Sequence, residues 1–533
     1  MDPTELLTGL ARPGAFPRAG PTVEVRQTHI SMVFLTGDRV YKVKKPVALW
    51  GFLDYSTPER RRALCEEEVR LNRRLAPDVY LGVEPVVVRD GRPAVGGPGE
   101  VVDWCVVMRR LADEATLAHR VRAGLADASE ADAVGRYVAA FHDRAAVGAT
   151  GPAVVPVAFA RVLRQNFLAT RAAVPAVFPA ALHAWLDRRM AWLLRRHRRT
   201  LARRLREGRA VDGHGDLRAE HLVRAAGPGA TSWIAIDALE YAPAMRRIDP
   251  LSDVAFLAMD LASLGRRDLC DALLRAYVGA RGDPDAGALL PLFLAFRAHV
   301  RAKVDAHRAR EPEIPPPDRA SALVGARHHL ALAWSWARTG LVPPLVLLAG
   351  AAGTGKSHAA RRVAPWLGAD VYASDVERKR LAGLAPTARV EGPALAALYS
   401  REMSIRTYDA IGGLAVRALA AGRPAVLDAT FLLRAARARA VAAARAGGAP
   451  TVVVELTVPD DVARARLLAR ARAGGDPSDA TVDVRRAQLA ESEPVGDAEA
   501  DVVLRADASG EPDAFLLPML DALVRHRSQA RWA

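Results

Sequence analysis

A glycine-rich octapeptide, residues 350–357, carries the clearest chemistry in the chain. It reads Gly350-Ala351-Ala352-Gly353-Thr354-Gly355-Lys356-Ser357 and lies between the apolar run 345–349 and a helix-like stretch at 358–367. In such a context the glycines let successive backbone N–H groups turn toward nucleotide phosphates, Lys356 reaches the outer phosphates and Ser357 ligates Mg²⁺. A flexible Gly/Ser linker would be flanked by polar coil instead. The octapeptide therefore predicts binding of ATP or GTP.

Two carboxylates in the same part of the chain follow strand-like runs. Asp375 ends the run 371–375, and Asp428 lies in the run 425–430. Because the carboxyl ends of parallel strands meet at one edge of a sheet, both carboxylates are expected to face the nucleotide. Asp375 is then placed to bind and deprotonate an acceptor hydroxyl, and Asp428 to orient Mg²⁺ or its bound water.

An arginine-rich stretch, residues 464–472, follows the strand-like run 451–458. In small-molecule kinases a mobile lid brings arginines onto the transferring phosphoryl group and excludes water. Arg470 and Arg472 are our candidates for this catalytic role. The competing interpretation is a plain surface helix.

A second constellation lies in the first half of the chain. Its loop reads His214-Gly215-Asp216-Leu217-Arg218-Ala219-Glu220-His221, and the strand-like run 234–237 follows and ends in Asp237. Phosphoryl transfer needs a carboxylate that accepts the hydroxyl proton, a basic group near the transferred phosphoryl and a second carboxylate on Mg²⁺. Asp216, Arg218 and Asp237 fit these three roles.

The elements around the two constellations suggest two domains. Short strand-like pieces at 23–43, a helix at 58–75 and further strands precede a predominantly helical region after residue 115. This layout resembles the protein-kinase-like fold, an α+β arrangement with a sheet lobe at about 20–110 and a helical lobe at 111–340. The prolines at 311–317 and 343–344 favour a boundary near residue 340. Residues 341–533 are then expected to form a P-loop α/β domain with a parallel sheet.

The first half resembles the aminoglycoside phosphotransferase family, whose loop reads HGDxxxxN and whose next strand carries a metal-binding Asp. The run 248–257 is similar to that family's Asp-Leu-Ala helix, which packs behind the loop. The resemblance implies that Lys42 binds nucleotide phosphates and that Glu68 is its ion-pair partner, with Lys44 and Glu67 as competing positions. It also places His221 where the family has a metal-binding Asn. Imidazole is a poorer ligand for Mg²⁺ than an amide oxygen.

The second half is similar, over residues 342 to about 505, to the zeta-toxin, gluconate-kinase and polynucleotide-kinase group. The order of the two halves resembles a bacterial fusion family of an aminoglycoside phosphotransferase-like protein with an ATP-binding kinase. The resemblance implies ATP- and Mg²⁺-dependent phosphorylation of a hydroxyl on a small molecule, with the acceptor left open. Two alternatives remain: a regulatory ATPase with a pseudokinase first half, and a nucleic-acid end kinase.

Net charge, cysteine spacing and the length of apolar runs indicate which partners, metal sites and cellular location to expect. The 533 residues carry a net charge of +15, from 75 basic and 60 acidic side chains. Because arginine and alanine are both abundant, we attribute this charge to a GC-rich coding bias, and a nucleic acid is a possible but not a favoured partner. The three cysteines, Cys65, Cys105 and Cys270, lack the spacing of a zinc site or a disulfide framework. No apolar run approaches the ~20 residues that span a bilayer, and residues 1–20 lack the regions of a signal peptide. We expect a cytoplasmic protein without a membrane anchor.

Overall fold

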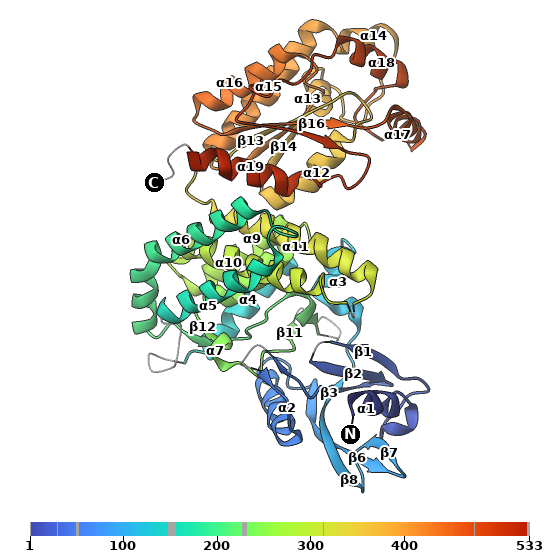
Figure 1. Ribbon diagram of the computed structural model, residues 1–533, viewed down its shortest axis with the longest axis vertical. Helices are drawn as coiled ribbons and strands as arrows, with labels where there is room; N and C mark the ends of the chain where they lie inside the picture. Colours follow the sequence, from blue (N-terminus) through green and yellow to red (C-terminus); the bar gives the residue numbers. More distant parts are fainter. Residues whose placement is uncertain are drawn as a thin grey trace. The chain divides into compact units, whose positions relative to one another are not determined.

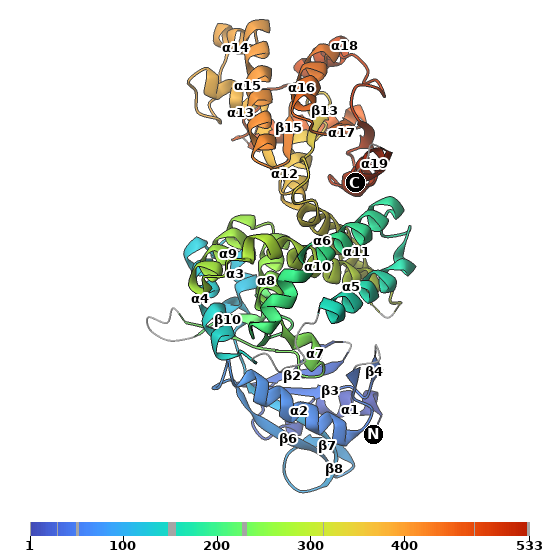
Figure 2. The same cartoon turned by 90° about the vertical axis from the view of Figure 1, so that its left-hand side faces the viewer.

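The chain folds into two compact units, and the computed structural model describes residues 2–28, 30–49, 53–147, 156–225, 232–312, 314–473 and 475–529 (Figures 1 and 2). Unit 1 comprises Met1–Phe159 and His197–Phe293. Unit 2 comprises Ala160–Arg196 and Leu294–Ala533. Three helices contribute residues to both units: α5 (Pro156–Thr170), α6 (Ala180–Arg206) and α10 (Ala286–Arg308).

Unit 1 begins with a six-stranded antiparallel sheet in the order β1-β2-β3-β8-β6-β7. Its strands are β1 (Glu24–Gln27), β2 (Ser31–Thr36), β3 (Arg39–Lys44), β6 (Tyr80–Arg89), β7 (Arg92–Val95) and β8 (Glu100–Arg109). The turn between β2 and β3 contains Gly37 at a φ of 55°, a conformation that glycine adopts readily in a tight hairpin. A separate small pair is formed by β4 (Ala48–Leu49) and β5 (Leu53–Asp54).

The alternation of side chains along β3 decides which residues reach the candidate site. Tyr41 and Val43 join an apolar core with helix α1 (Pro3–Leu10) on one face of the sheet. Because successive side chains of a strand point to opposite faces, Lys42 and Lys44 turn the other way. On that face helix α2 (Pro58–Asn72) packs, and its buried residues include Glu68.

The rest of unit 1 is mainly helical, and α4 and α9 lie against each other. A Cβ on Gly135 of α4 would lie 2.5 Å from the carbonyl oxygen of Leu273 in α9, so glycine permits this close approach. The remaining helices and strands are α3 (Leu117–Arg122), α4 (Ala128–Arg144), β9 (Val211–Asp212), β10 (Leu222–Arg224), β11 (Trp233–Ala235), α7 (Pro243–Arg246), β12 (Arg247–Ile248), α8 (Pro250–Ser263) and α9 (Arg267–Arg281). Short 3₁₀ helices occur at η1 (Pro13–Ala15), η2 (Asp113–Ala115) and η4 (Ala219–His221).

Unit 2 contains a five-stranded parallel sheet in the order β14-β15-β13-β16-β17. Its strands are β13 (Leu345–Ala349), β14 (Asp370–Ala373), β15 (Ala425–Asp428), β16 (Thr451–Thr457) and β17 (Val502–Asp507). Every residue of β13 and β15 is buried, which is why these strands are continuous apolar runs. Figure 1 shows α15 and α16 on one face of the sheet and α12 and α19 on the other. The architecture confirms the fold class expected for both parts of the chain.

The helices of unit 2 are η3 (Arg171–Ala173), α11 (Pro316–Ala337), α12 (Lys356–Leu367), α13 (Ser374–Leu381), α14 (Gly392–Leu398), α15 (Arg401–Ala420), α16 (Arg434–Ala446), α17 (Asp460–Ala473), α18 (Val482–Glu491) and α19 (Leu516–Gln529), together with parts of α5, α6 and α10. Within the described part of the chain, no helix combines the length and the apolar content needed to cross a membrane.

The division into units differs from a single boundary near residue 340. Helix α11, which precedes that position, packs within unit 2: the ring of His328 stacks on Trp366 with centroids 4.1 Å apart, and the Ser335 hydroxyl donates to the carbonyl oxygen of Leu367 over 3.1 Å. The prolines mark the two ends of α11, but side-chain packing decides which compact unit a helix joins. A cut at residue 340 would remove these contacts from unit 2.

The buried Arg204 of α6 connects segments of the helical part of unit 1 through ion pairs with Asp249 and Asp283. Arg204 is 1% exposed, and its guanidinium donates to Asp249 Oδ2 over 2.7 Å and to Asp283 Oδ1 over 2.7 Å. Asp249 also caps α8, since its Oδ1 accepts from the backbone N–H of Leu251 over 2.9 Å. The network therefore positions α8, the helix that carries Asp253.

Arg204→Met should destabilise unit 1, because the change leaves buried carboxylates without their cation. Breaking a buried ion pair from one side costs about 3–5 kcal/mol. Chemical denaturation followed by circular dichroism would measure the loss. Arg199→Met is the matched control, because Arg199 lies on the same helix, α6, is exposed and should leave the denaturation midpoint unchanged. Equal midpoints for both variants would contradict a stabilising role for the Arg204 network.

Candidate functional site

The loop at residues 213–221 of unit 1 is held by one fully buried carboxylate. Asp253 of α8 accepts from the backbone N–H of His214 over 2.7 Å and from that of Gly215 over 3.0 Å. A Cβ on Gly213 would lie 2.5 Å from Asp253 Oδ2, so the loop approaches the carboxylate closely only because glycine stands there. These bonds fix the backbone from which Asp216 projects.

Asp216 and Arg218 lie together in this loop. The Nε of Arg218 donates to Asp216 Oδ2 over 3.3 Å, and its Nη2 pairs with Glu220. Burial would lower the pKa of Arg218, but the neighbouring carboxylates of Asp216 and Glu220 raise it overall. The guanidinium therefore stays charged next to a carboxylate that is 31% exposed and reachable by a substrate.

The structure brings Lys42, Glu68 and Asp237 together. Lys42 Nζ lies 2.9 Å from Glu68 Oε1 and 2.6 Å from Asp237 Oδ1. Burial would lower the pKa of Lys42, but Asp237 and Glu68 raise it well above its usual value. The competing Glu67 instead pairs with Arg70 of the same helix, at 2.7 Å, and with Arg246, at 3.5 Å. This arrangement favours the register in which Lys42 and Glu68 are partners.

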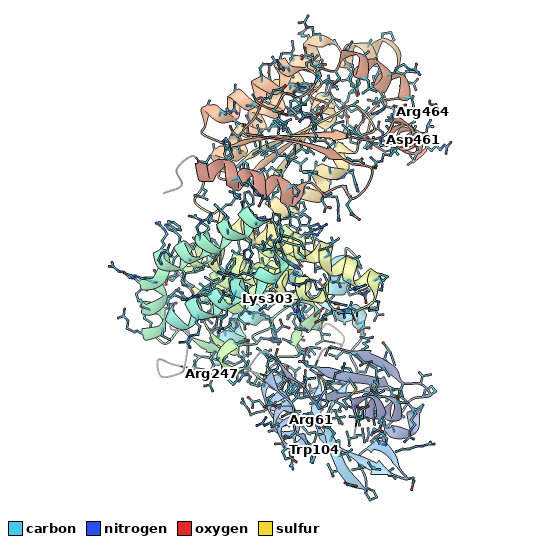
Figure 3. All side chains as sticks on the ribbon, in the orientation of Figure 1. Arg61, Trp104, Arg247, Lys303, Asp461 and Arg464 are labelled. Carbon is cyan, nitrogen blue, oxygen red and sulfur yellow. The ribbon has the colours of Figure 1, made fainter. Side chains whose placement is uncertain are left out.

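The competing Lys44 occupies a second, fully buried ion cluster. Its Nζ lies 2.6 Å from Glu68 Oε2 and also pairs with Glu240, which in turn accepts from the Tyr55 hydroxyl over 2.6 Å. Arg61, which Figure 3 labels on α2, donates to the Tyr55 carbonyl oxygen over 2.8 Å. Glu240 and Tyr55 were not expected from the sequence. Two lysines on one buried face need more than one carboxylate, and this requirement is the signal that could have indicated Glu240.

Asp237 is held in an unusual backbone conformation with a φ of 64°. Its N–H donates to the Tyr80 hydroxyl over 2.9 Å, and the N–H of Ala238 donates to Asn72 Oδ1 over 2.9 Å. Burial would raise the pKa of Asp237, but Lys42 and then His221 lower it well below its usual range. The group is therefore an anion at neutral pH and can bind a cation.

The ring of His221, the last residue of the loop, lies between the backbone of Asp216 and the side chain of Asp237. Its Nδ1 lies 2.7 Å from the carbonyl oxygen of Asp216, while its Nε2 lies 3.8 Å from Asp237 Oδ2. The side chain is 9% exposed. Among the described residues, no group of three or more His, Cys, Asp or Glu side chains is arranged to hold a metal ion. Asp237 and His221 thus form a pair, to which phosphate or water ligands would have to be added.

The glycine-rich loop of unit 2 runs from β13 into α12, as the sequence predicts. Gly350, Gly353 and Gly355 have φ values of 145°, 82° and 93°. A Cβ on Gly350 would lie 2.6 Å from the carbonyl oxygen of Leu456, so this position has no room for a side chain. Thr354 is buried, and its hydroxyl donates to the carbonyl oxygen of Ala351 over 2.9 Å. Backbone conformation and close packing together explain the glycines.

Lys356, Ser357, Asp375 and Asp428 surround the start of α12. Burial raises the pKa of Asp428, and a hydrogen bond from Ser357 together with the charge of Lys356 opposes this rise. Burial likewise lowers the pKa of Lys356, against the charges of Asp428 and Asp375. Strand β14 ends at Ala373, so Asp375 lies in the first turn of α13 and not at a strand end as expected. The local reason is that Ala373 is already the N-cap of that helix.

The two lid candidates differ in position. Arg470 donates to the carbonyl oxygen of Ala480 over 2.9 Å, and its charge lowers the pKa of Lys356, whereas Arg472 is exposed. Figure 3 shows Arg464 of the same helix, α17, at the outer edge of unit 2. The structure therefore brings Arg470 toward the loop and leaves Arg472 on the surface.

Two residues of α18 contact the glycine-rich loop directly. Arg485 is 5% exposed and donates to the carbonyl oxygen of Ala352 over 2.7 Å, while Gln488 Oε1 accepts from the N–H of the same residue over 2.8 Å. Sequence reasoning missed both residues, because one arginine among many in an arginine-rich chain carries no distinguishing signal.

Two solved structures that this chain resembles are a gluconokinase and a choline/ethanolamine kinase family protein. A gluconokinase from Sinorhizobium meliloti is 18% identical, with a TM-score of 0.26, over 36% of this chain and 97% of its own. A choline/ethanolamine kinase family protein from Mesorhizobium loti is 15% identical, with a TM-score of 0.36, over 65% of this chain and 92% of its own. At these identities the likeness concerns the fold alone.

Sequence comparison identifies closer relatives. Residues 345–495 match the family described as AAA domain. Uncharacterized protein Rv2004c of Mycobacterium tuberculosis and Uncharacterized protein Mb2027c of Mycobacterium bovis are each 35% identical over 418 residues, which cover 77% of this chain and 79% of the relative. The chain therefore belongs to the family of these mycobacterial proteins, and its residues 345–495 form the part that matches the AAA domain.

Proposed function

We propose that the protein is an ATP-dependent phosphotransferase with a separate nucleotide site in each unit, acting on a hydroxyl group of a small molecule. The observation that carries the proposal is the glycine-rich loop 350–357, which lies between a fully buried strand and a helix and has Asp375 and Asp428 beside its lysine. This loop lies within the region that matches the AAA domain family.

In unit 2 the loop would bind the nucleotide phosphates through its backbone N–H groups and the N-terminus of α12. Lys356 supplies the positive charge at the outer phosphates. Ser357 and Asp428, which share a hydrogen bond, have the hard oxygen ligands that suit Mg²⁺, which would neutralise phosphate charge when bound there. Arg485 and Gln488 support the loop from α18 by bonding to the carbonyl oxygen and to the N–H of Ala352, respectively.

Asp375 would deprotonate the acceptor hydroxyl as it attacks. Its charge acts on Lys356, which supports a position near the outer phosphates. Arg470 is assigned to the transferring phosphoryl, where negative charge must be stabilised and water excluded. Arg472 can join it only if α17 moves, because its side chain is exposed in this structure.

In unit 1 Lys42 would bind nucleotide phosphates, with Glu68 orienting its ammonium group. Asp216 is the proposed base toward the acceptor, and Arg218 beside it the proposed contact to the transferring phosphoryl. Asp237 and His221 would hold the divalent cation, which neutralises phosphate charge there. The clamp by Asp253 supports this assignment, because it keeps the backbone of the loop rigid around the proposed base.

One labelling experiment separates this proposal from its two alternatives. The full chain is incubated with γ-labelled ATP, a pool of small hydroxyl metabolites and 5′-hydroxyl oligonucleotides. A labelled small molecule supports the proposal. Labelled oligonucleotides would support a nucleic-acid end kinase. Binding of the oligonucleotide should then weaken steeply as salt is added, because the chain carries a net charge of +15. Free labelled phosphate without any labelled product would support a regulatory ATPase.

Lys356→Ala should abolish nucleotide binding by unit 2 and leave unit 1 unaffected, because each unit has its own lysine and carboxylates. Titration with a fluorescent ATP analogue should then give one site instead of two. Lys303→Ala, a change at a lysine of α10 outside either site, is the control and should retain both. Loss of all binding in Lys356→Ala would contradict the two-site proposal.

Lys42→Met and Lys44→Met should have different effects although the lysines are two residues apart. Lys42→Met, tested in the Lys356→Ala chain, should lower nucleotide affinity at least about tenfold by removing the phosphate contact. Lys44→Met should instead lower the free energy of unfolding by about 3–5 kcal/mol, because Glu240 would stay buried without its cation. Titration and chemical denaturation would measure the two effects, and the reverse pattern would assign the phosphate contact to Lys44.

Asp375→Asn should reduce phosphoryl transfer by about 10² to 10⁴ while nucleotide affinity stays within a few-fold, since a general base acts on the acceptor. The rate is measured with saturating ATP in the full chain. Asp370→Asn is the matched control, because Asp370 begins the preceding strand, β14, and pairs with Arg423. An equal fall in ATP affinity would make Asp375 a metal ligand and not the base.

A further inference from the structure

The orientation of the His221 ring is determined by its hydrogen bond to the loop. Its Nδ1 lies 2.7 Å from the carbonyl oxygen of Asp216, which can only accept, so Nδ1 carries the proton and donates it. In the neutral ring, Nε2 then has a free lone pair. A backbone carbonyl that orients a histidine in this way is the usual outer-sphere partner of a metal-binding imidazole.

The Nε2 lone pair and one oxygen of Asp237 are close enough to share a cation. Nε2 lies 3.8 Å from Asp237 Oδ2, while the other oxygen, Oδ1, is occupied by Lys42 at 2.6 Å. With metal–ligand distances of about 2.0–2.2 Å, two ligands of one cation are separated by roughly 3–4 Å. The spacing therefore suits a single ion between these two atoms.

Among the described residues, the neighbouring His214 does not serve as a second imidazole for this role. His214 stacks near His221 with ring centroids 5.8 Å apart, but its Nε2 donates to the carbonyl oxygen of Ile236 over 2.9 Å. Glu220 Oε1 lies 3.5 Å from His221 Nε2, but it is paired with Arg218. The protein ligands are thus one carboxylate and one imidazole.

We infer that the cation site of unit 1 selects Mn²⁺ over Mg²⁺, through direct coordination by His221 Nε2 together with Asp237 Oδ2. This inference rests on the proposed nucleotide site of unit 1 and adds the class of metal that this site takes. Mg²⁺ prefers oxygen ligands and strict octahedral geometry, whereas first-row transition metals bind imidazole readily. Phosphate oxygens of the nucleotide and water complete the coordination shell, and Mn²⁺ accepts this mixture of hard oxygens with one nitrogen.

The same hydrogen bond couples the metal site to the proposed base. The carbonyl oxygen that orients His221 belongs to Asp216, so a shift of the imidazole on binding a cation acts directly on the backbone of the residue that faces the acceptor. A metal ion that does not bind imidazole well would then affect both nucleotide binding and the position of the proposed base.

Electron paramagnetic resonance of bound Mn²⁺ tests the inference without using activity. The Lys356→Ala chain is loaded with a non-hydrolysable ATP analogue and Mn²⁺, and pulsed spectra are examined for ¹⁴N modulation from a directly bound imidazole. His221→Asn should remove this modulation and lower the affinity for Mn²⁺ by roughly tenfold or more. Its affinity for Mg²⁺, measured by competition, should stay the same or rise, because an amide oxygen replaces the nitrogen.

His119→Asn is the matched control, since it makes the same change at an exposed position of α3 in unit 1. It should keep both the ¹⁴N modulation and the Mn²⁺ affinity. If the nucleotide binds but no imidazole modulation is seen, or if His221→Asn and His119→Asn have equal Mn²⁺ affinities, the metal inference is wrong and the nucleotide site stands. If the Lys356→Ala chain binds no nucleotide with either metal, the proposed site in unit 1 fails and the inference fails with it.

Discussion

The candidate site of unit 1 depends on the two ion pairs of Glu68, whose carboxylate is shared between Lys42 and Lys44. Lys42 and Lys44 project from one face of β3 into a region with little water, where an uncompensated ammonium would be very unfavourable. Glu68 divides its two oxygens between them, and each lysine then needs one more carboxylate. Asp237 and Glu240, three residues apart in sequence, supply these carboxylates. Charge compensation thus ties the sheet of unit 1 to the segment after β11.

That tie also sets the geometry available for catalysis. With Oδ1 of Asp237 bound to Lys42, Oδ2 is left facing His221, and His221 is in turn bound to the backbone of Asp216. Asp253 clamps the same loop from behind through two backbone N–H groups. The proposed phosphate contact, cation site and base are therefore neighbouring groups, joined by hydrogen bonds and by the 3.8 Å approach of His221 to Asp237.

Unit 2 also places a lysine beside carboxylates, but here the backbone positions these groups. Here a parallel sheet brings the ends of β13, β14 and β15 to one edge, and the glycine-rich loop packs so tightly against Leu456 that its backbone has little freedom. Asp428 is buried next to Ser357 and Lys356, and α18 adds Arg485 and Gln488 to the loop backbone. Backbone geometry is the main organising element in unit 2, whereas paired side-chain charges play that part in unit 1.

The local features of the protein could be predicted from its amino-acid sequence. Glycine spacing, apolar runs and the hairpin turn at Gly37 depend on backbone conformation over a few residues, and they were sufficient for the fold class and the loop 350–357. Three further features became visible in the folded structure: the partners of Lys42 and Lys44, the contacts of Glu240 and Arg485, and the packing of α11 within unit 2. These depend on charges and side chains that are distant in sequence, and on which buried cation finds which carboxylate, so no local pattern could specify them.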